Sequence, residues 1–357
     1  MQNDLILFAI PLFIIFMLVE MVYGIAVKRN TYKVNDVISN LSQGLISQAV
    51  VICVPFFQIG AYELISTWLG DASTHPIWQH WYGWLIALLV YDFLNYWVHR
   101  ISHECAFFWG CHVVHHQSQY FNFSTALRQE SFFPIVSCFF FFPMALLGIP
   151  SYQFAVVSVI TLLYQFLIHT EHIDKMGWFD SVFSSPSNHR VHHAINDEYI
   201  DKNFGAILII WDRIFGTFQK EDAKCVYGTK TPLHSWCPLK ALSASYYDIF
   251  LKSCLCKGVM NKMQAFYKGP DWMPNGTSLR GNKHSTINNR IYNPPFRKYG
   301  YFLAVGLFMA AFFFVCFLTV WADELSYLKK VVGLITILFA LYCASFYMES
   351  KDRPLDS

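Results

Sequence analysis

Residues 99–116 read HRISHECAFFWGCHVVHH and place five histidines directly after an apolar segment. A second stretch, NHRVHH at 188–193, repeats the H-x-x-H-H spacing of 112–116. On a helix, residues three and four positions apart lie on one face, so each stretch presents its imidazoles together. The eight imidazoles, with His169 as a candidate ninth, exceed what one metal ion binds. Because all-nitrogen ligation without cysteine suits a redox metal, the pattern predicts two irons side by side.

The composition is that of a membrane protein. Hydrophobic residues make up 55% of the chain, charged residues only 14%, and the mean hydropathy is +0.33. A net charge of +2 without a basic run excludes nucleic acid as a partner. The ten cysteines fit neither a disulfide framework nor a zinc site, and several lie in apolar stretches, so we expect reduced thiols.

Seven apolar segments are long enough to cross a bilayer, which takes roughly 20 residues. They are 5–27, 37–59, 81–98, 131–149, 151–169, 301–322 and 330–348. The first lacks a basic leader and a cleavage site, so we expect a retained helix. The fourth and fifth are split only around Gly148–Ser151 and should form a tight hairpin. The fold prediction is an all-α integral membrane protein with about seven transmembrane helices and a cytoplasmic, histidine-rich di-iron cap.

The charges of the short loops predict which side the histidines face. Three basic residues lie between positions 28 and 33, whereas the loop after the second segment holds Glu63 and Asp71 and no Lys or Arg. The positive-inside rule then makes the first loop cytoplasmic, and counting onward places every histidine cluster on that face. Lys329 and Lys330 are the exception, since the same count puts them outside. We expect an active site on the cytoplasmic face, at the endoplasmic reticulum of a eukaryote or the inner membrane of a bacterium.

The chain divides into four regions by composition. We predict N-terminal transmembrane helices over 1–80, a di-iron catalytic core over 81–219, a polar cytoplasmic cap with loops over 220–299 and a C-terminal transmembrane hairpin over 300–357.

Three carboxylates near the clusters are candidate catalytic residues. A metal-bound imidazole usually donates its other N–H to a carboxylate or carbonyl. Asp92 lies two helical turns before His99 on the same face, so we expect it to orient a histidine. Asp212 is a second candidate, although it can equally pair with Arg213 or cap a helix. Glu104 adjoins the first cluster and either contacts a polar cofactor or faces water.

Other metal and nucleotide motifs are absent from the sequence. There is no His-Glu-x-x-His, no Glu-x-x-His, no Gly-x-Ser-x-Gly and no Walker loop, which excludes the zincin, ferritin-type, serine hydrolase and P-loop sites. The remaining histidines are expected at surface or interfacial positions: His75, His80, His172, His234 and His284.

The spacing H-x3-H, H-x2-HH, H-x2-HH resembles the fatty acid hydroxylase and sterol desaturase superfamily of membrane di-iron enzymes. Between about residues 80 and 230, the stretches 96–100, 123–129, 168–171, 187–193 and 201–218 resemble its alkylglycerol-oxidising branch. The resemblance implies a helical membrane fold, oxygen activation at a cytoplasmic di-iron site and hydroxylation of a lipid C–H bond. The ligands it implies are His99, His103, His112, His115, His116, His169, His189, His192 and His193.

The branch further implies an ether-lipid substrate. Hydroxylation beside the ether oxygen gives a hemiacetal that collapses to an aldehyde and glycerol, with electrons from tetrahydrobiopterin and Glu104 as the candidate pterin contact. Sterol, fatty-acid or sphingoid-base hydroxylation or desaturation stays open, as does a reductase as the electron donor. Outside this chemistry, the alternatives are a metal transporter or sensor and a dizinc hydrolase. The expected partners are a lipid substrate, the membrane, O2 and an electron donor.

Overall fold

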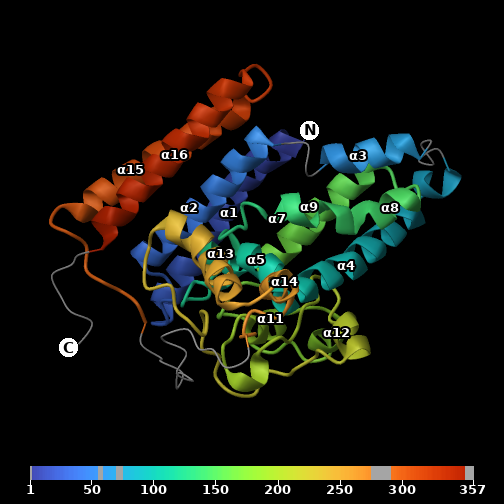
Figure 1. Ribbon diagram of the computed structural model, residues 1–357, viewed down its shortest axis with the longest axis horizontal. Helices are drawn as coiled ribbons and strands as arrows, with labels where there is room; N and C mark the ends of the chain where they lie inside the picture. Colours follow the sequence, from blue (N-terminus) through green and yellow to red (C-terminus); the bar gives the residue numbers. More distant parts are fainter. Residues whose placement is uncertain (1, 55–58, 70–74, 275–290, 350–357) are drawn as a thin grey trace.

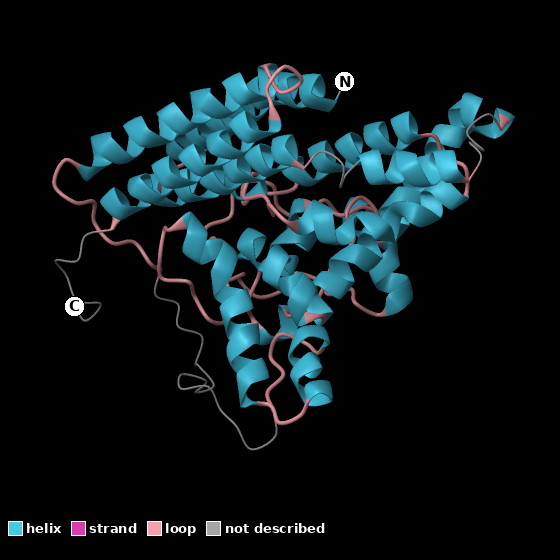
Figure 2. Ribbon diagram, turned by 45° about the horizontal axis from the view of Figure 1, so that its top comes forward, coloured by secondary structure: helices cyan, strands magenta, loops and turns pink. Residues whose placement is uncertain are grey.

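The structure is a computed structural model that describes residues 2–54, 59–69, 75–274 and 291–349. Within these residues the regular structure is helical, and the β-pairing consists of two isolated bridges, Phe183–Leu208 and Ala194–Tyr227. The long helices lie in one layer, and shorter helices and loops gather below it (Figure 1, Figure 2). The prediction of an all-α fold is therefore confirmed for the described residues.

Two C-terminal helices form the most apolar part of the molecule. Helix α15 (Gly300–Val320) and helix α16 (Tyr327–Met348) pack against each other and against α2 (Val34–Cys53). Both have the length and composition to cross a membrane, and only a third of their most apolar windows is buried inside the protein. The outer faces of these helices therefore suit lipid, as the segments 301–322 and 330–348 predicted.

By length and composition, α15 and α16 are the two membrane-span candidates among the described residues. Helix α1 (Gln2–Ala26) and helix α9 (Ser151–Leu167) are apolar but shorter over their described apolar stretches. Helix α4 (Trp81–Glu104) contains the predicted segment 81–98 and continues past it. A total of seven spans and the side that faces the cytoplasm stay predictions.

The segment 131–149 is not one helix, which corrects the sequence prediction. It is divided into α7 (Phe133–Ser137), a 3-10 turn η4 (Cys138–Phe141) and α8 (Phe142–Leu146). A proline stands at the start of both α7 and α8, where its missing N–H costs nothing, but it prevents a helix from running through. The tight turn into α9 does form, with Gly148 at a φ of 75°.

The segment 37–59 differs from its prediction as well. Helix α2 ends at Cys53, and residues 55–58 lie outside the described part of the chain. The first half of α2 buries polar side chains inside the protein, among them Asn35, Asp36, Asn40 and Gln43. This half is therefore a packed polar surface rather than a lipid-facing one.

A second apolar core lies at the other end of the long-helix layer. Here α3 (Ile59–Trp68) and the 3-10 turn η3 (Pro76–Gln79) pack with α4, α8 and α9. The rings of Tyr62 and Phe154 stack with centroids 4.3 Å apart, and the Tyr62 hydroxyl donates to the Ile149 carbonyl at 2.7 Å. This core fixes α4 and α9, whose lower ends carry histidines.

The lower part of the molecule consists of short elements. They are α5 (Ala106–His116), α6 (Phe123–Ala126), α10 (Phe179–Val182), α11 (Pro186–His192), η5 (Asp197–Tyr199) and α12 (Ile210–Phe215). The region 220–299, predicted as a cap with loops, also contains two helices, α13 (Pro238–Leu255) and α14 (Val259–Tyr267). Pro238 begins α13 instead of breaking it. The proline content of residues 220–299 therefore did not exclude helices in this region.

Candidate metal centre

Four segments from different parts of the chain bring the nine predicted histidines together. The last turns of α4 carry His99 and His103, and an extended residue, Cys105, separates α4 from α5. Helix α5 carries three more histidines at its C-terminal end. His169 follows the last residue of α9 by two positions, and α11 with its C-cap supplies the last three.

The nine rings form two adjacent groups. The five-ring group consists of His99, His103, His112, His116 and His192, and the four-ring group of His115, His169, His189 and His193. Within each group, one nitrogen from every ring lies within 4.8 Å of the others. The groups touch where the rings of His116 and His193 stack with centroids 4.4 Å apart. Eight of the rings are buried and His115 is half-buried.

Backbone carbonyls fix the tautomer of four rings. The Nδ1 atoms of His99, His115, His169 and His192 lie 2.6–3.1 Å from the carbonyl oxygens of Phe204, Arg128, Gln165 and Lys202, respectively. A carbonyl oxygen only accepts, so each neutral ring carries its proton on Nδ1. The Nε2 atom is left with a bare lone pair, which is the form that binds a metal.

The bare nitrogens of two such rings face each other in the four-ring group. His115 Nε2 and His169 Nε2 are 3.2 Å apart, although both rings have their proton on Nδ1. Burial lowers the pKa of His115 to about 4, so a protonated ring does not supply the missing hydrogen near neutral pH. Two lone pairs directed at one point repel each other unless a cation lies between them, and a bound metal ion meets that need.

The spacing between nitrogens fits a metal as well. Two nitrogens bound at about 2.1 Å from one metal ion and at right angles lie about 3.0 Å apart. Across the centre, the Nε2–Nε2 distances are 3.1 Å for His99 and His112, 3.0 Å for His112 and His116, and 3.0 Å for His169 and His189. The donor set therefore fits two all-nitrogen metal sites.

Several ring nitrogens have no hydrogen-bond partner although they are buried. They are Nε2 of His103, His192 and His193 and Nδ1 of His189. Leaving a buried polar atom unpaired destabilises a fold, and natural proteins rarely do so without a function. Three of them, the Nε2 atoms of His103, His192 and His193, indicate a missing ligand, whereas His189 directs its Nε2 toward His169.

Burial holds the rings in their neutral form. It lowers the pKa of His112 to about 3, and it lowers the pKa of His116, His189, His192 and His193 well below the ordinary value. Neighbouring imidazoles lower the last four further, because two like charges in one buried site repel each other. Neutral rings are the metal-binding state, so no proton has to leave at neutral pH.

Two carboxylates contact the five-ring group, and sequence reasoning missed both. Glu130 accepts a hydrogen bond from His112 Nδ1, and Asp201 Oδ1 lies 3.4 Å from His103 Nδ1. Burial raises the pKa of Glu130 to about 7, while the neighbouring His115 lowers it. The carboxylate that is hydrogen-bonded to one of these rings is thus Glu130, 18 positions from His112 in sequence, rather than Glu104, which is next to His103 in sequence.

Asp92 was expected to orient a histidine, but its hydrogen-bond partners among the described residues lie elsewhere. It accepts from the backbone N–H groups of Ile207 and Leu208 at 2.8 and 3.1 Å and from Trp211 Nε1 at 2.9 Å. It therefore anchors the loop before α12 to α4. The helical face that Asp92 shares with His99 therefore meets this loop at Asp92 and the other rings at His99.

Asp212 acts on the centre through one intermediate residue. Its carboxylate accepts from the N–H groups of Phe204 and Gly205 at 2.8 and 2.7 Å and from Thr217 Oγ1 at 2.7 Å. The Phe204 carbonyl in turn accepts from His99 Nδ1. Arg213 donates to the Ser181 carbonyl instead, so the predicted pair with Asp212 does not form. The Asp212 carboxylate instead caps the backbone N–H groups of the turn at residues 204–205.

Glu104 lies at the surface beside the centre. Its side chain is 49% exposed and accepts from Arg100 Nε at 2.8 Å. It contacts none of the nine rings through a hydrogen bond that the structure describes. Its predicted contact with a pterin stays a proposal.

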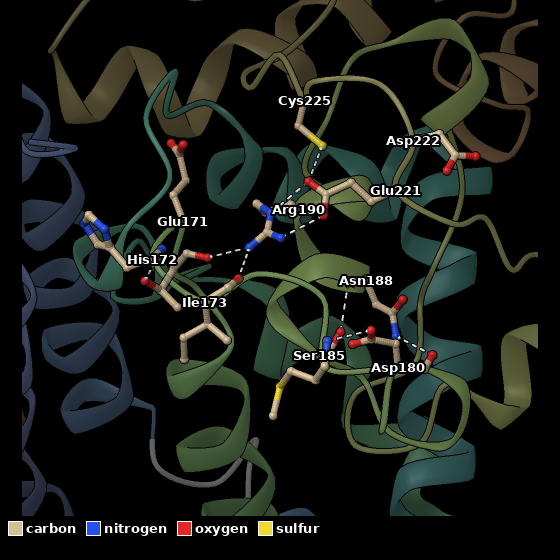
Figure 3. Close-up of polar contacts among 12 residues, drawn as sticks. Glu171, His172, Ile173, Asp180, Ser185, Asn188, Arg190, Glu221, Asp222 and Cys225 are labelled. Atoms are coloured by element: carbon tan, nitrogen blue, oxygen red, sulfur yellow. Dashed lines mark hydrogen bonds and ion pairs between the residues drawn. The ribbon is translucent and has the colours of Figure 1, made fainter. Parts of the chain in front are cut away.

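An arginine between two of the histidines ties α11 to its surroundings. Arg190 forms a two-pronged ion pair with Glu221, at 2.8 and 2.7 Å, and donates to the carbonyls of Thr170 and Ile173 (Figure 3). Because Thr170 follows His169 directly, this one side chain couples the end of α9 to α11. The loop that carries Glu221 is held to the same point, with Cys225 alongside (Figure 3).

A buried polar network supports the other side of the centre. Arg128, whose carbonyl holds His115, donates from its guanidinium to Ser39 and Asn40 of α2 and to the Val114 carbonyl of α5. Asp36, also buried on α2, provides the negative charge opposite Arg128. This network explains the polar first half of α2, because it anchors the loop that orients His115.

The histidines left out of the clusters take surface or structural places. His75 accepts from the Ile77 N–H at the start of η3, His80 is exposed, and the His172 ring packs edge-on against Tyr23. His234 is exposed, and the prediction for His284 lies outside the described residues. All ten cysteines are free thiols, as expected.

Comparisons with known proteins agree with the geometry. The sequence profile of the fatty acid hydroxylase family matches residues 84–217, the stretch that holds all nine rings. The chain is 39% identical over 268 residues to an alkylglycerol monooxygenase of Danio rerio, 37% over 267 residues to that of Homo sapiens and 36% over 262 residues to that of Xenopus tropicalis. No solved structure matches the chain.

The matched part covers most of this chain but less of the relatives. It is 74% of the chain against 59% of the length of the Danio rerio and Homo sapiens enzymes, and 73% against 58% for Xenopus tropicalis. The chain thus spans somewhat more than half of the curated relatives that it matches. Residues 84–217 are thus similar to the fatty acid hydroxylase family, whose profile matches this part of the chain.

Proposed function

We propose that the chain is a membrane-bound di-iron monooxygenase that hydroxylates a lipid C–H bond with O2. The observation that carries the proposal is the pair of bare nitrogens on His115 and His169, held 3.2 Å apart in a buried site lined by further unpartnered rings. An all-imidazole donor set suits a redox metal, and the two groups of rings accommodate two ions.

The five-ring group would hold one iron and the four-ring group the other. Bound there, the pair would supply reductive activation of O2 and insertion of one oxygen atom into a C–H bond. We assign no hydrolytic role to the centre, because the clusters contain imidazoles and no carboxylate or thiolate ligand among the described residues.

The protein's own contribution is orientation and exclusion of water. The carbonyls of Phe204, Arg128, Gln165 and Lys202 hold four rings in one tautomer, so these rings do not reorganise when a metal binds. Glu130 accepts a hydrogen bond from His112 Nδ1 and so increases the electron density of that ring.

Aromatic side chains enclose the rings. The ring centroids of Phe204 and Trp109 lie 5.2 and 4.9 Å from that of His103. The Phe121 ring stacks on His169 with centroids 5.4 Å apart. An apolar enclosure lowers the local dielectric and keeps bulk water from the reacting groups. Such an enclosure also suits an alkyl chain better than a polar substrate.

For the substrate we propose an ether lipid of the alkylglycerol class, because four relatives that are 33–39% identical to the chain are named for alkylglycerol. Hydroxylation of the carbon beside the ether oxygen would release an aldehyde and a glycerol derivative. A sterol, fatty acid or sphingolipid is the alternative substrate for the same centre.

The electron donor and the position in the membrane belong to the proposal too. Two electrons are needed for each O2, and we propose a reduced pterin, tetrahydrobiopterin, or a reductase as their source. Glu104 is the proposed pterin contact because its exposed carboxylate lies one residue from the centre. We place the centre on the cytoplasmic face of the membrane that holds α15 and α16.

The test is a substrate panel with purified, iron-loaded protein. Alkylglycerol, a sterol, a free fatty acid and a ceramide are each supplied with O2 and either tetrahydrobiopterin or a reductase with its nicotinamide donor. The proposal expects aldehyde release from alkylglycerol, equal to O2 consumed, and its loss in His115→Ala. Turnover of a sterol or an acyl lipid instead would overturn the substrate assignment, and substrate loss without O2 consumption would overturn the reaction.

A further inference from the structure

Helix α14 directs its apolar side chains away from the protein. Val259 and Met260 are 77% and 71% exposed, and Met263 and Tyr267 are 54% and 52% exposed. At 100° per residue these four occupy an arc of about 100°. Ala265, on the other side of the helix, is buried against α5 and α13. A helix that faced water would show the reverse arrangement.

Helix α13 repeats this feature. Tyr247 and Phe250 are 61% and 60% exposed, while Ile249 between them is buried in the contact with α5 and α14. We call the outward side chains Tyr247, Phe250, Val259, Met260, Met263 and Tyr267 the hairpin face. Six large apolar side chains on the outside of one helical hairpin indicate a surface that is covered by a partner or by lipid rather than by water.

The position of the hairpin indicates that lipid covers this surface. Glu349, the first residue after α16, accepts hydrogen bonds from Ser235 Oγ and the Trp236 N–H, two residues before α13 begins. Gln43 of α2 donates to the Pro238 carbonyl at the start of α13. Since α16 is a membrane-span candidate, its end marks a surface of the bilayer, and α13 begins at that level.

The direction of the hairpin agrees with its position. Helices α13 and α14 run across the direction of α15 and α16, projecting from the long-helix layer rather than extending it (Figure 1, Figure 2). If α15 and α16 cross the membrane, a pair of helices at a steep angle to them lies along its surface. Amphipathic helices in this orientation insert their apolar face at the boundary between headgroups and acyl chains.

The charges on the hairpin favour an anionic surface. Lys257, Lys262 and Lys268 are exposed on α14 and its ends, and Lys240 is exposed at the start of α13. Asp248 is the one exposed acidic residue within the two helices and their connecting turn. Lysines beside an apolar face reach anionic headgroups while the apolar side chains contact acyl chains.

We propose that the α13–α14 hairpin docks on the surface of the bilayer that α15 and α16 cross, with its lysines on anionic lipid headgroups. Helix α13 packs on α5 through Ile249 and Ala106, and α5 carries His112, His115 and His116. Docking of the hairpin therefore fixes the height of the metal centre above the acyl chains. The proposal needs no metal in the centre, so it stands or falls separately from the proposed function.

Cys254 supplies a natural reporter, because it is the exposed cysteine among the ten and lies on the outer side of α13. The full chain is reconstituted in nanodiscs, one chain per disc, and Cys254 is labelled with bimane. Quenching by lipids with a shallow doxyl group is compared with quenching by aqueous iodide. The control is Ala223→Cys in a Cys254→Ser background, which places the same label at an exposed position of the loop beside Glu221.

The proposal expects strong quenching by doxyl lipid at position 254 and an iodide quenching constant at least about threefold lower than at position 223. Met263→Glu should reverse that pattern, whereas Asn261→Glu, on an exposed polar position of the same helix, should not. Replacing anionic lipid by phosphatidylcholine should weaken the doxyl quenching.

Three results would overturn the proposal. One is iodide quenching at position 254 equal to that at position 223, which would leave the face open to a soluble partner. Another is protection that arises only with two chains in a disc, which would assign the face to a second copy. The third is doxyl quenching that Met263→Glu leaves unchanged.

Discussion

The two groups of rings differ in what holds them. In the five-ring group, Glu130 contacts His112 and Asp201 lies 3.4 Å from His103, so a side-chain carboxyl group stands behind two of the rings. In the four-ring group, the Nδ1 atoms of His115 and His169 are hydrogen-bonded to backbone carbonyl oxygens. The first group therefore has a spare ring and carboxylate support, whereas the second depends on every ring and on the exact placement of its backbone.

The largest expected effect comes from removing one ring from each group. On the proposed assignment, His169→Ala removes a ligand of the four-ring group and should lower the iron content by one ion per chain, because three rings do not replace the lost donor. His116→Ala takes one from the five-ring group, which keeps four rings and should retain most of its iron. Iron per chain measured by plasma mass spectrometry checks both. Equal loss in the two variants would erase the distinction between the groups.

Glu130 should matter more to its group than any exposed carboxylate does. Glu130→Ala removes the acceptor for His112 Nδ1 and should lower metal affinity by about 10- to 100-fold, as loss of such a partner does elsewhere. Glu130→Gln keeps an acceptor oxygen without the charge, so the loss should be smaller.

Competition with a chelator measures this affinity. The matched control is Glu104→Gln, which breaks an exposed pair with Arg100 and should leave the affinity unchanged. An equal effect of the two glutamate variants would contradict the role given to Glu130.

The four-ring group should be the more sensitive to the clamp around Arg190. Glu221→Gln leaves the buried guanidinium without its charge partner and should destabilise the fold by about 3 kcal/mol. Because Arg190 also holds the residue after His169, the variant should loosen the iron of the four-ring group first. Thermal unfolding and stepwise chelation follow the two effects. Loss of the five-ring iron first would show that the clamp acts elsewhere.

The stability of the metal-free protein should depend on pH through its buried histidines. The pKa values of His112 and His115 are lowered by burial to about 3 and about 4, so the native chain stays unprotonated where the unfolded chain binds protons. The stability of the metal-free protein should therefore fall as the pH drops below 6.5, by about 1.4 kcal/mol per pH unit for each such ring.

Glu130 contributes in the opposite direction. Its pKa is raised to about 7 by burial, so the native state keeps a proton that the unfolded state loses above pH 4.5, and stability declines as the pH rises toward 7. Glu130→Gln should remove this decline and leave the histidine effect. Unfolding midpoints of the chelated protein between pH 5 and pH 8 test the signs. A stability that rises on acidification below 6.5 would contradict the burial of neutral rings.

The contrast between the two groups also shows what the sequence can predict. Eight of the nine rings were identifiable from their spacing of three and four residues, which is local and needs only a helix to bring them together. His169 lies outside this spacing and was implied by the family resemblance. Glu130 and Asp201 were missed, because each meets its histidine through the tertiary fold at a distance of 18 and 98 positions along the chain. Nothing in the local pattern distinguishes Glu130 from an ordinary loop carboxylate.

The same limit explains the errors in the fold. Hydropathy predicted a span over 131–149, but prolines at the starts of α7 and α8 divide it. Apolar content likewise predicted a span in α2, whose buried polar half supports Arg128. The helices α15 and α16 were predicted within a few residues, since a long apolar run without proline has few other structures.

The most direct test of the metal centre is iron analysis combined with Mössbauer spectroscopy on the purified, iron-loaded protein. Two adjacent groups of neutral rings predict two irons per chain with the spectrum of a coupled pair, reduced to a single uncoupled ion in His169→Ala. Less than one iron per chain, or an iron content that His169→Ala leaves unchanged, would contradict the assignment.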